Sequence, residues 1–203
     1  MAPHPKPFVI FLNGPSSSGK TSIAKALGYL LPSPTLVIGI DTFIKLIPAG
    51  KPLFLFDVEH DQNNSPIARV IPTHYGKKLC HALTQTTKVL IDNGFNLIID
   101  EVLLEKDALN SYLEQLATNR VYLVGVRCQL ATLEEREAVR GDRKHGMARA
   151  QLESFNLLNL RYDFEVDTTH TVPFDCARQI LAFIEKRPKP SAFERCREKF
   201  AGK

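Results

Sequence analysis

The chain of 203 residues has the length of one domain, since compact domains usually run to about 100–200 residues. Hydrophobic residues make up 44% and charged residues 24%, a balance that supports a packed core and argues against wholesale disorder. No apolar run approaches the roughly 18 residues of a membrane span, and the first forty residues lack the pattern of a secretory signal. We therefore expect a cytoplasmic protein without a membrane span.

The net charge of +4 is concentrated near the C-terminus, because seven Lys and Arg residues and only two glutamates lie from Lys186 onward. The rest of the chain is close to neutral and has no basic stripe, so we do not expect a nucleic acid as partner. We predict a single domain over residues 1–186 and a solvated basic tail over 187–203, with a membrane-surface or partner contact of the tail as the alternative. The four cysteines are scattered, which argues against a disulfide framework and a zinc site.

Apolar runs alternate with amphipathic stretches along the chain, a pattern typical of an α/β fold with a largely parallel sheet. The apolar runs predict five strands, over Phe8–Leu12, Thr35–Ile40, Phe95–Ile99, Val121–Val126 and Phe164–Val166. The amphipathic stretches predict helices over Lys20–Leu31, Thr73–Asp92, Ala108–Thr118, Leu130–Arg140 and Asp175–Lys186. Between Pro48 and Pro72 the pattern breaks, and we interpret residues 48–72 as an insertion over a substrate site, with a surface excursion as the alternative.

A phosphate-binding motif follows the first predicted strand. Residues 14–21 match G-x-x-x-x-G-K-[ST] between an apolar strand and a helix, which is the context that this motif requires. Glycines in such a loop let backbone N–H groups close around phosphate oxygens, and the helix N-terminus adds a favourable dipole. We predict that Lys20 contacts the β and γ phosphates of ATP and that Thr21 holds Mg²⁺. The predicted ATP-binding residues are Gly14, Pro15, Ser16, Ser17, Ser18, Gly19, Lys20 and Thr21.

Carboxylates follow two of the predicted strands. Asp100 and Glu101 end the third strand, where a Walker B acid meets the metal, and we assign the metal to Asp100 while Glu101 could share or replace that role. Alternatively, both cap the next helix. Asp41 follows the second strand and could accept the proton of an attacking hydroxyl, or it could be the N-cap of a helix that begins at Thr42. Both interpretations of Asp41 can hold together.

Arginines follow the fourth strand in a charged segment. Arg136 and Arg140 are four residues apart and share one helix face, and Gly141 leaves Arg143 on a loop. Such a cluster, in a lid over about residues 136–150, could close over ATP and offset charge on the transferred phosphoryl group. An ordinary solvated helix with Glu/Arg pairs is the alternative. Asp167–Thr169, after the last strand, could line the nucleotide base or form a plain turn.

Taken together, these segments resemble the chloramphenicol phosphotransferase family of P-loop kinases. The resemblance rests on Phe11–Thr21, Gly39–Asp41, Ile98–Val102, Val124–Cys128, Arg140–Arg143 and Tyr162–His170, which are spread over about residues 8–185. It implies a three-layer P-loop fold similar to nucleotide kinases, with a five-stranded parallel sheet, helices on both faces and an arginine-bearing lid. It further implies ATP with Mg²⁺, Asp41 as catalytic base, and Arg136, Arg140 and Arg143 in the lid.

Two departures from the family pattern bear on function. Pro15 stands where the loop of the family commonly has glycine, and little beyond Phe56-Asp57 aligns in the region expected to shape the acceptor pocket. We therefore predict a Mg²⁺-dependent kinase that moves the γ-phosphate of ATP to a hydroxyl of a small molecule. The alternatives are another small-molecule or nucleotide kinase of the P-loop superfamily and a non-catalytic nucleotide-binding module. The acceptor and the oligomeric state are left open.

Overall fold

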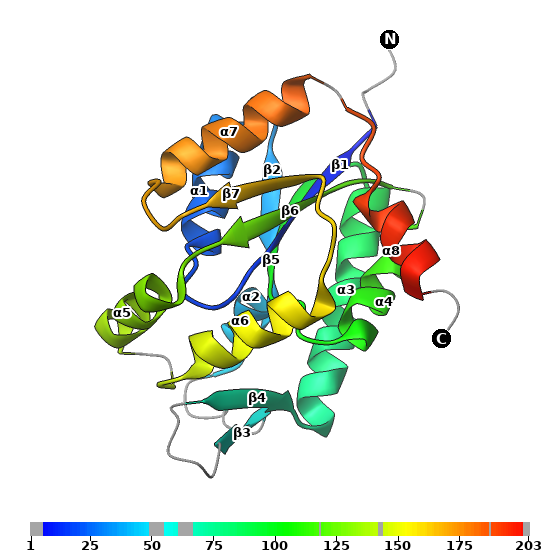
Figure 1. Cartoon of the computed structure of the whole chain (residues 1–203). Coiled ribbons are helices and arrows are strands. Elements are labelled where there is room, and N and C mark those ends of the chain that lie inside the picture. Colours follow the sequence, from blue (N-terminus) through cyan, green and yellow to red (C-terminus); the bar gives the residue numbers. More distant parts are fainter. Residues whose placement is uncertain are drawn as a thin grey trace.

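The computed structural model describes residues 6–48, 55–60, 67–117, 119–141, 144–186 and 188–200. Five parallel strands form the central sheet in the order β2-β5-β1-β6-β7 (Figure 1). They are β1 (Phe8–Asn13), β2 (Thr35–Ile38), β5 (Asn96–Glu101), β6 (Arg120–Arg127) and β7 (Phe164–Asp167). The five-stranded parallel sheet predicted from the apolar runs is confirmed.

Helices cover both faces of the sheet and divide the core into two parts. On one side Ile10 and Leu12 of β1 pack with α1 (Lys20–Leu30) and α7 (Pro173–Glu185). On the other side Phe11 packs in a core shared by α3 (His74–Asp92), α4 (Lys106–Gln115) and α8 (Ala192–Phe200). Because both faces are covered, β1 is buried from Val9 to Asn13, which explains its unbroken apolar sequence.

The remaining helices lie at the carboxyl ends of the strands. They are α2 (Ile40–Ile44), α5 (Leu130–Arg140) and α6 (Met147–Leu158). In Figure 1, α6 lies between the sheet and a two-stranded hairpin. The sequence analysis did not predict α6, and it gave α2 only as an alternative that began at Thr42. The structure corrects that start, because the N-cap of α2 is Gly39 and Asp41 lies inside its first turn.

The hairpin is the described part of the predicted insertion. Strands β3 (Phe56–His60) and β4 (Ala68–Pro72) pair antiparallel, so this part is a small sheet rather than an irregular loop. Its base is tied to α3 by Thr73, whose backbone N–H and hydroxyl both donate to the carbonyl of Leu55, at 2.9 and 3.1 Å. Residues 49–54 and 61–66 of the insertion lie outside the described part of the chain.

The expectation of a solvated C-terminal tail is wrong for residues 192–200. Helix α8 buries Phe193 and Cys196 in the main core. Its N-terminal turn is held by the carboxylate of Asp163, which accepts from the backbone N–H groups of Ser191 and Ala192 at 2.8 and 2.9 Å. Three cationic side chains of α8 donate to backbone carbonyls of neighbouring segments, namely those of Arg195, Arg197 and Lys199. Among the described residues, no helix is both long and apolar enough to span a bilayer.

Candidate active site

A cavity of about 1070 Å³ opens at the carboxyl ends of the strands, where open α/β sheets bind ligands. It brings together the six described residues that were predicted to do chemistry, which come from four segments of the chain. They are Lys20, Thr21, Asp41, Asp100, Arg136 and Arg140. From the phosphate-binding loop Ser16, Ser17 and Gly19 also line the cavity. Arg143 lies outside the described residues.

The loop between β1 and α1 has the backbone of a phosphate cradle. Ser17 and Gly19 adopt positive φ angles of 63° and 87°, which turn the chain sharply before α1 begins at Lys20. Gly14 must lack a side chain, because a Cβ there would lie 2.4 Å from the carbonyl oxygen of Val126. Pro15 contributes its carbonyl, which accepts from the Lys20 ammonium at 2.9 Å. The loop therefore holds its lysine at the cavity through one of its own carbonyls.

The two carboxylates at the end of β5 have different partners. Asp100 accepts from the hydroxyl of Thr21, with 2.6 Å between Oγ1 and Oδ2. Glu101 accepts from the backbone N–H of Ile40. Neither caps the following helix, because the N-cap of α4 is Glu105. Thr21 and Asp100 are thus adjacent, as the predicted metal pair requires, whereas Glu101 is engaged by α2.

The donor set suits Mg²⁺ better than a metal held by protein alone. The described residues contain no group of three or more His, Cys, Asp or Glu side chains placed to hold a metal ion. Mg²⁺ usually takes one or two protein oxygens and completes its shell with substrate phosphates and water. Thr21 and Asp100, next to the phosphate cradle, fit that pattern.

Asp41 reaches the cavity because the β2–α2 turn is pressed against β5. A Cβ on Gly39 would lie 2.2 Å from the carbonyl oxygen of Asp100, so only glycine fits there. Burial raises the pKa of Glu101 to about 8, and the nearby carboxylates of Asp100 and Asp41 add to the increase. The hydrogen bond from the Ile40 N–H acts in the opposite direction and lowers this pKa. The site therefore gathers three carboxylates around one lysine.

The lid arginines lie on α5, and both line the cavity, as their spacing predicted. The guanidinium of Arg136 donates to the carbonyl of Thr168 at 2.7 Å and contacts the Cys128 thiol at 3.5 Å. The buried carboxylate of Glu137 accepts from the backbone N–H groups of Gly146 and Ala148, at 2.8 and 2.7 Å. That carboxylate fixes the start of α6 against α5.

Two residues tie the phosphate-binding loop to other elements, and only Thr168 lies in a segment that the sequence had singled out. Gln151 of α6 is nearly buried, and its Oε1 accepts from the backbone N–H of Ser16 at 2.7 Å. Thr168 is buried after β7, and its hydroxyl lies 2.8 Å from the carbonyl of Ser18. These contacts join the phosphate-binding loop to the lid and to the end of β7. The sequence marks 167–169 as part of the family resemblance and as a lining of the base or a turn, but not as a contact of the phosphate-binding loop.

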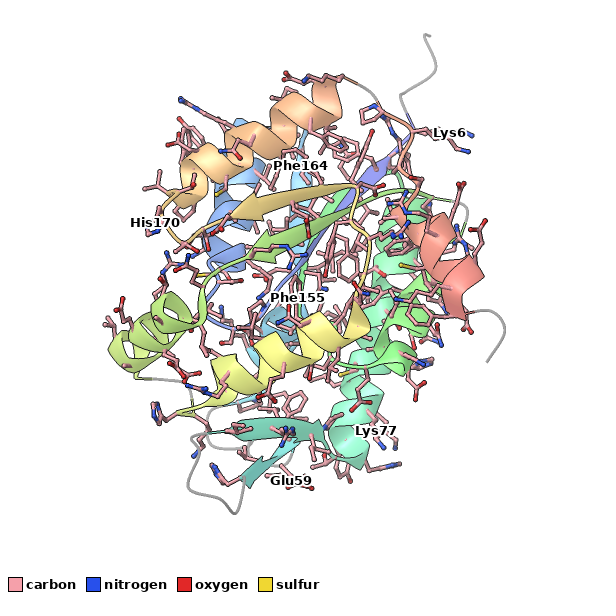
Figure 2. The ribbon with its side chains drawn as sticks, in the orientation of Figure 1. Lys6, Glu59, Lys77, Phe155, Phe164 and His170 are labelled. Carbon is pink, nitrogen blue, oxygen red and sulfur yellow. The ribbon has the colours of Figure 1, made fainter. Side chains whose placement is uncertain are left out.

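The rest of the cavity is mainly apolar and is formed by α2, α3, α4, the β5–α4 loop and the hairpin. Its apolar lining includes Ile44, Phe56, Val70, Leu83, Leu104 and Ala108. Figure 2 shows Lys77, which also lines the cavity, near the N-terminal end of α3 beside the hairpin. Burial raises the pKa of Cys80 to about 11, with a contribution from Glu101, and also raises the pKa of Tyr112. These apolar residues line the same cavity as the carboxylates of Asp41, Asp100 and Glu101.

Residues 8–185 match the family model of chloramphenicol phosphotransferase-like proteins. The chain belongs to this family. Two curated proteins of Mycobacterium tuberculosis, from strains H37Rv and CDC 1551 / Oshkosh, are each 31% identical to it, over 98% of this chain and 92% of theirs. Their names are "Putative O-phosphotransferase Rv2636" and "Putative O-phosphotransferase MT2714". The family resemblance predicted from the sequence is confirmed.

Solved structures of kinases share the fold. The APS kinase CysC of Mycobacterium tuberculosis, in complex with AMPPNP and APS, superposes with a TM-score of 0.59 at 15% identity, over 90% of this chain and 99% of that one. Shikimate kinase from Acinetobacter baumannii, in complex with shikimate, gives 0.58 at 16% identity, over 89% and 94%. The tunicamycin resistance protein of Deinococcus radiodurans gives 0.56 at 17% identity, over 87% and 95%. Family and fold together identify a kinase-like phosphotransferase.

Proposed function

We propose that this protein transfers the γ-phosphate of ATP to a hydroxyl group of a small molecule in a Mg²⁺-dependent reaction. The observation that carries the proposal is the shared cavity, in which a phosphate cradle, a Thr/Asp metal pair and a further carboxylate meet an apolar chamber. A module that only bound nucleotide would need neither the third carboxylate nor the chamber. In the described part of the basic C-terminal segment, α8 packs into the core through Phe193 and Cys196, which disfavours a free arm that would bind a partner.

Each charged group has a role that its position permits. The backbone of Ser16–Thr21 holds the phosphates, and Lys20 exchanges its contact with Pro15 for a phosphate oxygen. Thr21 and Asp100 hold Mg²⁺, which when bound neutralises charge on the phosphate oxygens. Arg136 and Arg140 approach from the lid side and offset charge on the transferred phosphoryl group.

We assign Asp41 the role of the base that takes the proton of the acceptor hydroxyl. It lines the cavity between the phosphate cradle and the apolar chamber, where an alcohol bound in that chamber would present its hydroxyl. A carboxylate within hydrogen-bond reach of that hydroxyl takes up its proton as the oxygen attacks phosphorus. The apolar lining favours an acceptor whose body is largely apolar over a highly charged metabolite.

The proposal is tested by ADP release from ATP and Mg²⁺ in the presence of a panel of small alcohols, with chloramphenicol as one member. A positioned base contributes about 10²–10⁴ to the rate, so Asp41→Asn should lower acceptor phosphorylation by about that factor. ATP binding, measured by calorimetry, should stay within about twofold, because a carboxamide keeps the shape of the side chain. Unchanged turnover in Asp41→Asn would remove Asp41 from the base role.

A further inference from the structure

Strand alternation sends the two terminal carboxylates of β5 to opposite faces of the sheet. Ile98 packs in the core of α1 and α7, and Ile99 packs in the core of α3, α4 and α8. Successive side chains of a strand alternate between faces, so Asp100 follows Ile98 and Glu101 follows Ile99. The contacts agree, because Asp100 meets Thr21 of α1 whereas Glu101 meets α2. Asp100 and Glu101 therefore lie on opposite faces of the sheet and bind different groups.

Glu101 supplies what the short helix α2 lacks. The first N–H groups of a helix have no partner within it, and Ile40 is the first residue of α2. The Oε1 atom of Glu101 accepts from that N–H, one residue before Asp41. Helix α2 has five residues, none of them fully buried, and only Ile40 and Phe43 pack partly buried against the core. The direction of so short a helix therefore depends on the contacts of its first turn.

The backbone on the other side of this contact allows little movement. Gly39 lies against the carbonyl oxygen of Asp100, so close that a Cβ would overlap it. The last residues of β5 thus hold the start of α2 twice, through the main chain at Asp100 and through the side chain of Glu101. The β2–β5 pairing ends at Ile38, and the packing of Ile40 and Phe43 does not fix the N–H of Ile40. Loss of the Glu101 contact therefore allows the first turn of α2, with Asp41, to shift.

We propose that Glu101 is a positioning residue for Asp41, which holds the first turn of α2 so that the Asp41 carboxylate faces the acceptor hydroxyl, and that Glu101 does not bind the metal. The proposal rests on the proposed function, because the placement of Asp41 matters to the rate only if Asp41 is the base. The side chain acts as a hydrogen-bond acceptor, and a neutral acceptor of the same length should serve.

Two variants of nearly equal size separate this role from a charged one. Glu101→Gln keeps an oxygen that can accept from Ile40, whereas Glu101→Met keeps the length without that oxygen, and Glu101→Ala replaces it should the Met variant fail to fold. The first measurement is ADP release from ATP and Mg²⁺ with water as acceptor. A shift of about 1 Å in a reacting group can cost about 10²-fold, so Glu101→Met should slow ADP release by about that factor. Glu101→Gln should stay within about threefold of the wild-type rate.

A second measurement needs no turnover. Hydrogen exchange of the Ile40 amide, resolved by ¹⁵N NMR, should be slow in the wild type and in Glu101→Gln and at least about tenfold faster in Glu101→Met, because only the last leaves that N–H without its acceptor. The KM for ATP and the Mg²⁺ concentration for half-maximal rate should not change by more than about twofold in any variant. Glu114→Ala, an exposed carboxylate on α4, is the matched control and should match the wild type throughout.

Three outcomes would overturn the positioning role. Glu101→Gln as slow as Glu101→Met would mean that the charge is needed, and a raised Mg²⁺ requirement would mean that the side chain serves the metal. Unchanged exchange of the Ile40 amide in Glu101→Met would mean that the contact does not hold α2. The Asp41→Asn/Glu101→Met double variant should be no slower than Asp41→Asn alone, and a further 10²-fold loss would show that Glu101 acts independently of Asp41. Wild-type rates in Asp41→Asn would instead remove Asp41 from the base role on which this proposal rests, whereas a wild-type protein that releases no ADP would refute the proposed function itself.

Discussion

The two halves of the cavity are built in different ways. The half assigned to the phosphates comes largely from one run of consecutive residues, 14–21, whose backbone would make most of the proposed phosphate contacts. The acceptor half comes from side chains of α2, α3, α4, the β5–α4 loop and the hairpin, which are far apart in sequence. A phosphate can be held by one loop because backbone N–H groups suffice. The body of an organic acceptor requires a wall, and several elements must supply it.

The halves also differ in their electrostatics. Lys20, Arg136 and Arg140 give the phosphate half positive charge. In the acceptor half, burial raises the pKa of Cys80, Tyr112 and Glu101, so each favours its neutral form over a wider pH range. A polar cradle against an apolar wall strengthens the interactions of charged groups at their boundary, since water screens them less. Asp41 lines the same cavity but is itself exposed.

The largest expected effect comes from the phosphate half. Lys20→Ala removes the ammonium that this loop holds at the cavity, and the loss of a group aimed at developing charge costs about 10²–10³ in rate. We expect kcat/KM for ATP to fall by about 10³ while acceptor binding changes by less than about threefold. ADP release and calorimetry measure the two quantities. Lys25→Ala, an exposed lysine on α1, is the control, and a loss below tenfold in Lys20→Ala would contradict the assigned role.

A smaller effect of opposite selectivity is expected from the acceptor half. Phe56 of β3 lines the cavity and is half-buried. Full burial of a phenylalanine side chain contributes about 1.5–3 kcal/mol, and truncation to alanine removes the part of that contribution that a bound acceptor would gain. We expect Phe56→Ala to raise KM for the acceptor about tenfold with the KM for ATP unchanged. Steady-state kinetics with varied acceptor and varied ATP separate the two constants.

The control for Phe56→Ala lies on the same strand. Glu59 is exposed on β3, and Figure 2 shows it on the hairpin away from the sheet. Glu59→Ala should leave both constants unchanged. Equal effects of Phe56→Ala on ATP and acceptor would mean that the two halves are not separate sites.

The same contrast explains what could be predicted from the sequence. The five strands, their parallel arrangement and the phosphate cradle follow from local patterns, because buried parallel strands are continuously apolar and the cradle is one motif. Asp41, Asp100, Arg136 and Arg140 could be placed because strand ends and helix spacing bring them to one edge. Their presence in one cavity matches that placement, whereas their chemical roles stay predictions.

Other features depend on tertiary contacts that no local pattern carries. Helix α8 looked like a basic tail because seven cationic residues from Lys186 onward outnumber its few apolar ones, yet Phe193 and Cys196 suffice to dock it. The hairpin was hidden by prolines and polar residues that are typical of loops. Gln151 could not be recognised because its importance comes from one contact with Ser16, 135 residues away.

The smallest expected effect concerns the link between the halves, which α6 provides. Toward the lid and the phosphate-binding loop, α6 is held through the buried Glu137 and Gln151. Toward the hairpin it has a backbone bond from Ala68 to Gly146 at 3.2 Å and the Arg69–Glu153 ion pair at 3.2 Å, whose side chains are 52% and 45% exposed. Exposed pairs contribute about 0–1 kcal/mol and are screened by salt.

Arg69→Ala should therefore change the free energy of unfolding by less than about 1 kcal/mol, and the difference should vanish in 1 M salt. Denaturant titrations of variant and wild type at low and high salt measure it, with Lys88→Ala as the control because Lys88 and Asp92 form an exposed pair within α3. A larger loss that persists in salt would mean that the hairpin is held to α6 as firmly as the phosphate-binding loop is. The hairpin that lines the acceptor half would then be rigidly joined to the phosphate half. In that case Phe56→Ala should change the KM for ATP as well as the KM for the acceptor.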